Sequence, residues 1–508
     1  MSLLFVLLPL LGALAIAFGA PARKVCLGAA ALVLVFALGC LFCWDAGGWS
    51  FSANVLPRPN INLALGFADG MSVVMVILGA LVMFAASLAG KAPEGSERLW
   101  YSSILLIGGG ALGAFLSTDL FFFYAFHELA LIPTFLTIGL LGRGDRRETA
   151  WKITIYLAFG SIVLLAGLVW LVGASGAQSF AFSDILAGSI DPTAQKGIAL
   201  LLIIGFGTLI SLFPFHSWAA PAYASAPAPV AMLHAGVLKK FGLYGLIRLY
   251  PSVSEGLQAW LVPLIVLLLG NILWVGFVTL NQRRLDNMLG YSSVMHMGYI
   301  FLAFAALISA GSVEANTLAI PAMVVLMFAH GVSIALLFGL IDVVRQRTGT
   351  LEIDQLGGLA KAAPRLCFLF GLAAMASLGL PGLANFAGEV MVFLSGFKNF
   401  HGPADLGPVQ IATILALWGV VISAVYLLRA FRNTFQGPEV ASGANATDLT
   451  ATERIPAIML AAALLIVGIY PNGMVHLINR TNVPTVDTIE AVVNESSPTP
   501  TAVAEASH

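Results

Sequence analysis

The sequence predicts an all-α integral membrane protein with about fourteen transmembrane helices. Of its 508 residues, 59% are hydrophobic and only 10% are charged. The mean hydropathy of +0.94 is far above that of a soluble domain. The apolar residues also gather in stretches of about 20, the length that a helix needs to cross the hydrocarbon core. The net charge of -1 and the absence of a basic run argue against a nucleic-acid partner.

The apolar stretches follow one another along almost the whole chain. In order they fall at about 3–19, 26–43, 71–90, 101–117, 119–141, 151–173, 197–215, 227–250, 257–280, 288–309, 318–341, 364–400, 411–430 and 455–473. Residues 1–20 lack a basic n-region and a convincing cleavage site. We therefore interpret the first stretch as a spanning helix and not as a removed signal peptide.

Two of these segments are predicted to be broken, the seventh and the twelfth. The twelfth, 364–400, is too long for one straight helix and carries Leu380, Pro381 and Gly382 in its middle. The seventh ends in the proline-rich sequence FPFHSWAAPAYASAPAP. Membranes tolerate such interruptions only where the freed backbone faces protein or a wet cavity. The breaks therefore indicate a polar path inside the bundle.

The basic residues predict the orientation of the spans. Seventeen of the 24 lysines and arginines lie in odd-numbered loops, which places those loops in the cytoplasm and both termini on the other side. The hydrophilic stretches at 44–70, 174–196 and 437–453 are too short for a soluble domain. The tail, 479–508, is rich in Pro, Thr, Ser, Ala and Glu and is predicted to be disordered.

A few ionisable side chains lie at membrane depth, where an ionised group costs roughly 2.5 to 3.5 kcal/mol and is functional by default. They are His127, Glu128, His234, Lys239, Lys240, His296, His330 and Glu389, with His216 at a broken end. Buried carboxylates, lysines and imidazoles can exchange protons near neutral pH, so the set predicts a proton or ion path. The alternative is a structural role: a satisfied core histidine in each single case, and an interhelical hydrogen bond for Glu128.

Motifs for cofactors and metals are missing. The sequence has no G-x-G-x-x-G opening a βαβ unit and no P-loop. Cys40 and Cys43 form a C-x-x-C, but it lies in an apolar helix without a second pair, which favours packed thiols over a metal site. We expect no cofactor and no metal in this chain.

Several motifs, in this order, resemble one known family. They are FFFYAFHELALIPTF, FPFHSW, APAPVAMLHAGVLKKFGLYGLIR, GYSSVMHMGYIF, FAHGVSIALLFGL and LPGLANFAGEVMVFLSGF. They belong to a match that runs from about residue 70 to 435 and that resembles the antiporter-like membrane subunits of the proton-pumping NADH:quinone oxidoreductase, complex I. The resemblance implies two inverted repeats of five helices, at about 101–280 and 288–430.

The family's proton-path residues fall on matching positions of this sequence. The resemblance implies that role for Glu128, Lys240, His296, His330 and Glu389, with His127, His216, His234 and Lys239 as possible accessory groups. Paralogues usually carry a lysine at the last of these positions, so Glu389 favours the subunit M branch, whose mitochondrial counterpart is subunit four.

The chain also departs from the family pattern. The lysine of the seventh span, which pairs in the family with the glutamate of the fifth, is replaced by Leu209. The Lys-Arg pair before the tenth span reads Asp286-Asn287. The resemblance thus implies that Glu128 lacks its usual partner, and His127 or a water-borne link is the candidate substitute.

The resemblance implies a division into helices 1–3 at 1–95, a first repeat at 96–285, a second at 286–435, a linker and last helix at 436–478, and the tail at 479–508. It implies proton translocation driven by NADH oxidation and quinone reduction elsewhere, with NADH, FMN, iron-sulfur clusters and quinone in other subunits. Subunits like L and N would be partners in a bacterial inner membrane. The alternatives are an Mrp-type cation/proton antiporter subunit, a membrane subunit of an energy-converting hydrogenase, and a purely structural paralogue.

Overall fold

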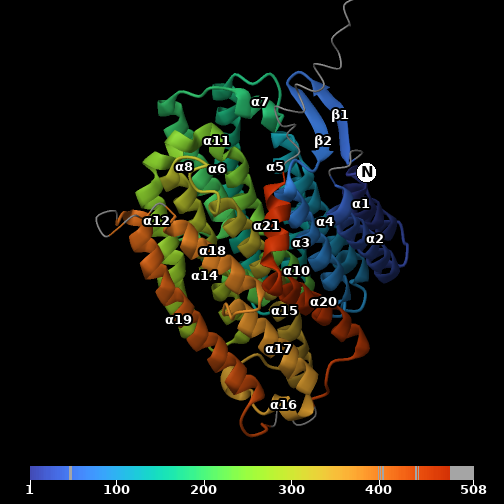
Figure 1. Ribbon diagram of the computed structural model, residues 1–508. Coiled ribbons are helices and arrows are strands. Elements are labelled where there is room, and N and C mark those ends of the chain that lie inside the picture. The colour runs from blue at the N-terminus through green and yellow to red at the C-terminus, as the bar shows by residue number, and fades with distance from the viewer. Residues whose placement is uncertain are drawn as a thin grey trace, which may run out of the picture.

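The computed structural model is a bundle of long helices (Figure 1) and describes residues 1–44, 49–398, 400, 402, 406–440, 443 and 446–480. Twelve of the described helices are long and apolar enough to cross a membrane, and Leu3–Ala17 and Pro364–Ser377 are shorter apolar helices. The predicted helical membrane fold is confirmed, with one short hairpin in addition to the helices, whereas the number of fourteen spans stays a prediction. The predicted disordered tail lies outside the described residues, apart from its first two positions.

The N-terminal part contains a hairpin that the sequence analysis did not predict. After the helices α1 (Leu3–Ala17) and α2 (Ala22–Cys43), the chain forms the antiparallel strands β1 (Ser50–Pro57) and β2 (Asn60–Gly66). The helix α3 (Gly70–Leu88) follows. Ile61 and Leu65 of β2 are buried, and the hairpin lies beside the first helices (Figure 1). The stretch 44–70 is thus partly structured, because alternating apolar residues give the second strand one face that packs.

The next part holds the helices that precede the first interruption. They are α4 (Glu97–Leu116), α5 (Leu120–Leu141), α6 (Arg146–Ser175), α7 (Phe182–Ala187) and α8 (Pro192–Ile210). Asp119 caps α5, because its carboxylate accepts hydrogen bonds from the N–H groups of Phe121 and Phe122. This cap fixes where α5 begins.

The chain between α8 and the next long helix is interrupted twice. Residues 211–218 separate α8 from α9 (Ala219–Ser225), and Ala226 and Pro227 separate α9 from α10 (Ala228–Leu233). The π-helical turn η1 (His234–Leu238) joins α10 to α11 (Lys240–Ala259). This part continues through α12 (Leu261–Leu269), η2 (Gly270–Val275) and α13 (Gly276–Leu280). That these interruptions break a single spanning helix stays a prediction.

The C-terminal half contains two long buried helices and a second interruption. The long helices are α14 (Leu285–Ala310) and α15 (Ala319–Thr348), and α17 (Pro364–Ser377) is separated from α18 (Ala384–Gly396) by residues 378–383. The remaining elements are η3 (Ile353–Gln355), α16 (Leu359–Ala362), α19 (Pro408–Phe435), α20 (Ala451–Ile469) and α21 (Pro471–Asn479). Gly379 and Gly382 have φ of 79° and 90°, which glycine adopts without the steric cost of a side chain.

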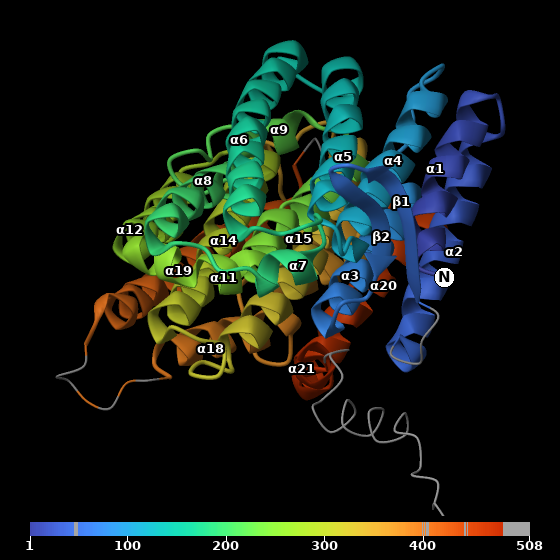
Figure 2. The ribbon, with the colours of Figure 1, turned by 90° about the horizontal axis from the view of Figure 1, so that it is seen from above.

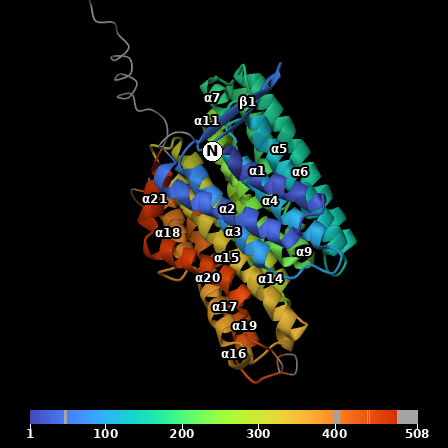
Figure 3. The same cartoon turned by 90° about the vertical axis from the view of Figure 1, so that its right-hand side faces the viewer.

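The core of the bundle is formed by α10, η1, α11, α14 and α15, which are buried along most of their lengths. Helices α6, α12 and α19 lie at the periphery (Figure 2; α6 also in Figure 3). Trp151 and Trp170 of α6, Trp274 of η2 and Trp418 of α19 are exposed. A polar bridge fixes the core to the N-terminal helices: Arg248 of α11 donates to both oxygens of Asp69 at 2.6 and 2.8 Å. Large exposed apolar side chains on the outside suit a lipid environment.

Candidate functional site: a buried polar line

Two adjacent lysines lie at the centre of the bundle and contact different partners. Lys239 and Lys240, at the junction of η1 and α11, are at most 1% exposed. The Nζ of Lys240 lies 2.8 Å from His330 Nδ1 and donates to the carbonyl of Ala235 at 2.7 Å. The Nζ of Lys239 donates to Ser293 Oγ at 3.4 Å. Successive helical residues diverge by about 100°, so the two ammonium groups face two different sides of the core.

From Lys240, a line of buried polar side chains continues through two histidines. His330 of α15 and His296 of α14 have ring centroids 5.6 Å apart. His296 Nδ1 lies 2.8 Å from the carbonyl oxygen of Ser292, and Nε2 lies 2.9 Å from that of Ser377. Because Ser377 is the last residue of α17, His296 contacts the backbone at the edge of the 378–383 interruption. Each ring nitrogen is thus placed to donate whenever it carries a hydrogen.

Glu389 ends the line on the far side of that interruption. Its side chain on α18 is buried, and its carboxylate lies so close to Gly379 that a Cβ built there would be 2.3 Å from Oε2. Tyr299, whose ring centroid is 5.8 Å from that of His296, and Tyr426 are within electrostatic range of Glu389. The interruption at 378–383 therefore adjoins both His296 and the Glu389 carboxylate.

The predicted groups on α5 form a separate arm. Glu128 accepts a hydrogen bond from the Ser161 hydroxyl of α6, and its Oε1 is 3.5 Å from His127 Nδ1. The Glu128 side chain is 35% exposed, so it lies at the edge of the bundle and not deep inside it. The His127 ring stacks on the ring of Phe241, with centroids 3.9 Å apart. Phe241 directly follows Lys240 in the sequence.

The position of Leu209 agrees with the loss of a partner for Glu128. Leu209 is buried near the end of α8. Within the part of the chain that the structure describes, His127 is the only basic side chain within ion-pair distance of the Glu128 carboxylate. The α5 arm thus reaches the central lysines through an aromatic stack and without a lysine of its own.

His234 and His216 lie differently from the main line. His234 Nδ1 is 3.3 Å from the Tyr223 hydroxyl, and its ring meets Trp218 edge to face. His216 stacks on Phe213 in the 211–218 connection, with centroids 5.4 Å apart. His234 is connected to the lysine region through Tyr223, whose ring centroid lies 5.5 Å from Lys239 Nζ. His216 has no described hydrogen bond to another predicted site residue, although the charge of Lys239 acts on its ring.

Sequence reasoning missed several polar partners of the line. Tyr299 and Ser292 lie three and four residues from His296 on α14, so helical spacing alone could have identified them. Tyr426 of α19 hydrogen-bonds Ser292 Oγ at 2.7 Å, and Tyr223 reaches His234 from α9. Those two contacts depend on tertiary packing, and no local pattern marks them.

No group of three or more metal-ligating side chains occurs among the described residues. Cys26 and Cys40 are buried in α2. The Cys43 side chain lies outside the described residues, so the structure does not describe the C-x-x-C pair as a unit. The described ionisable groups at the centre are arranged in sequence along a line, which suits proton transfer between neighbours.

Comparison with known proteins places the chain in a family. The family described as "NADH:quinone oxidoreductase/Mrp antiporter, TM" matches residues 117–402. NAD(P)H-quinone oxidoreductase chain 4 1 of Synechococcus sp. (strain JA-3-3Ab) is 33% identical over 482 residues, which cover 92% of this chain and 89% of the relative. Chain 4 of Gloeobacter violaceus is 30% identical over 448 residues, covering 87% and 82%.

Solved structures agree. A chain of respiratory complex I from Thermus thermophilus with bound NADH superposes with a TM-score of 0.84 at 30% identity, covering 94% of this chain and 98% of that one. A chain of the Mrp complex from Dietzia sp. superposes with a TM-score of 0.80 at 20% identity, covering 97% and 99%. At that low identity the second likeness shows the fold alone.

Proposed function

Because the chain belongs to the family of NADH:quinone oxidoreductase and Mrp antiporter membrane subunits, we propose that it translocates protons in a complex I-type NAD(P)H-quinone oxidoreductase. Relatives named chain 4 support this assignment, as does a carboxylate at position 389. NADH oxidation and quinone reduction would occur in other subunits, which would hold the FMN and the iron-sulfur clusters. This chain would have no redox centre of its own.

The observation that carries the proposal is the line from Lys240 through His330 and His296 to Glu389. It crosses the centre of the bundle and ends beyond the interruption at 378–383. Each member is buried, so water competes little for its protons. Ionisable groups in this setting mark proton relays in membrane proteins.

The order of the line suggests how protons move. His330 and Lys240 are in direct contact, so a proton arriving at one repels a proton on the other. His296 can accept a proton from the His330 side and release it toward the interruption. Glu389 would be the terminal carboxylate that takes up the proton and releases it to the far side of the membrane.

The assembly and orientation follow from the same proposal. The neighbours would be subunits like L and N, in a bacterial inner membrane with both termini on the non-cytoplasmic side. The inverted repeats at about 101–280 and 288–430 would each contribute one interruption, 211–218 and 378–383. The line would then use elements of both repeats, since Lys240 belongs to the first repeat and Glu389 to the second.

The test is NADH-driven proton uptake into inverted membrane vesicles, with the quinone reductase rate recorded in parallel. The variant Glu389→Gln removes the terminal carboxylate and is expected to lower both uptake and rate. Glu314→Gln is the matched control, because Glu314 lies in an exposed loop beyond α14. Equal activity of the two variants would refute the role of Glu389.

The Mrp-type antiporter is the second candidate, favoured by a family description that includes it and by the shared fold. In that case uptake would follow an imposed sodium gradient without NADH. An energy-converting hydrogenase subunit would likewise show no response to NADH. The same vesicle assay therefore distinguishes both alternatives from a complex I-type subunit, for which proton uptake depends on NADH.

A further inference from the structure

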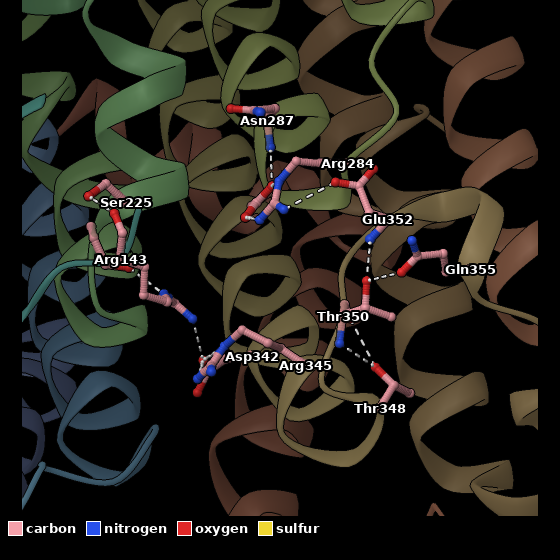
Figure 4. A network of polar contacts seen from close by, with 12 residues as sticks. Arg143, Ser225, Arg284, Asn287, Asp342, Arg345, Thr348, Thr350, Glu352 and Gln355 are labelled. Carbon is pink, nitrogen blue, oxygen red and sulfur yellow. Dashed lines mark hydrogen bonds and ion pairs between the residues drawn. The ribbon is translucent and has the colours of Figure 1, made fainter. Parts of the chain in front are cut away.

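A second cluster of buried charges lies at the start of α14 and near the end of α15, outside the line described above. Asp342 of α15 accepts hydrogen bonds from Arg143 at 3.3 Å, from Arg345 at 2.7 Å and from Gln346 at 2.7 Å. Figure 4 shows Arg143 and Arg345 approaching Asp342 from two sides. Asp286 of α14 is paired with Arg284 at 2.8 Å. Both aspartates are buried: Asp286 is 5% exposed and Asp342 is 6% exposed.

The cluster borders a small cavity of about 10 Å³. Its polar lining consists of Asp286, Asp342, Arg143 and Tyr223, and its other walls are apolar. A polar cavity of this size has room for about one water molecule, which needs two to four polar partners. A water molecule held there would link the two carboxylates with Tyr223, which lines the same cavity.

Tyr223 leads from this cavity to the central lysines. Its hydroxyl lies 3.3 Å from His234 Nδ1, and Lys239 Nζ lies 5.5 Å from its ring centroid. His234 is 2% exposed, and its Nε2 has no hydrogen-bond partner among the described residues. The other charged or titratable groups that act on His234 are Lys239, Lys240 and His127.

The positions of these groups along α14 and α15 place them in order between the two carboxylates and the central lysines. Ser293, the partner of Lys239, lies seven residues beyond Asp286 on α14, which is about 10 Å along the helix axis. Asp342 lies twelve residues from His330 on α15, about 18 Å along that helix. Tyr223 and His234 fill the interval between the carboxylates and the lysines.

We propose that Asp342 and Asp286 load protons through this cavity onto Tyr223, and that Tyr223 and His234 relay them to Lys239. The Tyr223 hydroxyl gives its proton to His234 Nδ1 and receives another from the carboxyl side. The imidazolium that forms releases its Nε2 proton toward Lys239, whose charge acts on the ring. The neutral ring then carries its hydrogen on Nδ1 and returns to the Nε2–H tautomer before the next transfer. The inference rests on the proposed function and adds a loading route to it, which this chain needs because Leu209 occupies the place of a lysine.

The test compares Tyr223→Phe with Tyr250→Phe. Both tyrosines are buried, and each substitution removes a single hydroxyl; that of Tyr250 contacts only the carbonyl of Leu307, at 3.4 Å, among described partners. The whole complex is reconstituted in vesicles, and NADH-driven proton uptake and quinone reduction are measured over a pH series. Tyr223→Phe should lower uptake by about threefold or more near neutral pH, a part of the roughly 100-fold that a positioned acid-base group can contribute. Tyr250→Phe should behave as wild type.

The pH series separates a relay from a packing role. A broken relay becomes limited by proton supply, so acidifying the loading side should restore uptake in Tyr223→Phe and in His234→Gln. A loss that is the same at every pH, or equal activity of the two tyrosine variants, would overturn the inference. A wild-type complex that oxidises NADH without taking up protons would refute the proposed function itself, and the same traces would reveal it.

Discussion

Replacing Lys240 by methionine tests the centre of the proposed proton line. Methionine keeps an unbranched apolar stem of similar length, so the main loss is the ammonium group that lies 2.8 Å from His330 Nδ1. We expect proton uptake to fall while the fold is kept. Lys196→Met is the matched control, because Lys196 is an exposed lysine of α8.

The magnitude follows from the distance between the two groups. Two unit charges 2.8 Å apart repel by about 6 kcal/mol at an effective dielectric constant of about 20. This repulsion disfavours the state in which Lys240 and His330 are both protonated, and so it drives one of the two protons onward. If only a quarter of it acts on the rate-limiting step, its loss slows transfer about tenfold. We therefore expect uptake in Lys240→Met to fall about tenfold or more.

The assay is NADH-driven proton uptake in inverted vesicles that hold equal amounts of assembled complex. His330→Gln and the double variant complete a cycle, because groups in direct contact give non-additive effects. The double variant should lose no more activity than Lys240→Met alone. Losses that multiply would show that the two groups act independently and would refute the reasoning, as would normal uptake in Lys240→Met.

Three further predictions address other parts of the structure. Gly379→Ala should lower proton uptake by displacing Glu389, whereas Gly382→Ala, which has a similar positive φ but no atom within 4 Å of the new Cβ, should not; equal losses would assign the effect to backbone strain. Glu128→Gln should lower uptake less than Glu389→Gln, because Glu128 is half-buried and has no lysine partner, and the reverse order in vesicle assays would contradict this. Partial burial raises the pKa of Asp448, but hydrogen bonds from the N–H groups of Leu449, Arg365 and Leu366 outweigh it and leave that pKa below its ordinary value. Its ionised form therefore stabilises the fold above the ordinary pKa, and the contribution is lost as the pH falls through the lowered one. Asp448→Ala should cost about 1 kcal/mol at neutral pH, seen as a lower unfolding midpoint of the complex in detergent, and a difference that persists in strong acid would contradict the assignment.

The helical membrane fold could be predicted because its signal is local. Stretches of about 20 apolar residues mark spanning helices wherever they pack. The hairpin at residues 50–66 was missed even though a signal was present, since alternating residues such as Ile61, Leu63 and Leu65 follow the two-residue period of a strand. The π turn at His234–Leu238 carries no such signal, because an apolar segment has the same composition in either helical form.

The site could be predicted only in part. The ionisable residues themselves were evident, because a charge in an apolar helix is rare. Their neighbours were not: Glu128 lies at the edge of the bundle because α6 supplies Ser161, and Tyr223 meets His234 because α9 folds back toward α10. Contacts of this kind depend on how neighbouring helices pack against each other, which local sequence patterns do not show.

The two central lysines explain how one helical turn can join both halves of the route. Lys239 faces Ser293 and Tyr223, on the proposed loading side, while Lys240 faces His330, on the proposed release side. Both side chains are fully enclosed, so little water screens one charge from the other. A proton that reaches Lys239 therefore raises the electrostatic potential at Lys240 and favours release from Lys240 toward His330. Under the proposed function, direct repulsion between the neighbouring lysines would perform the step that the resemblance assigns to a lysine on the seventh span, whose place is taken here by Leu209.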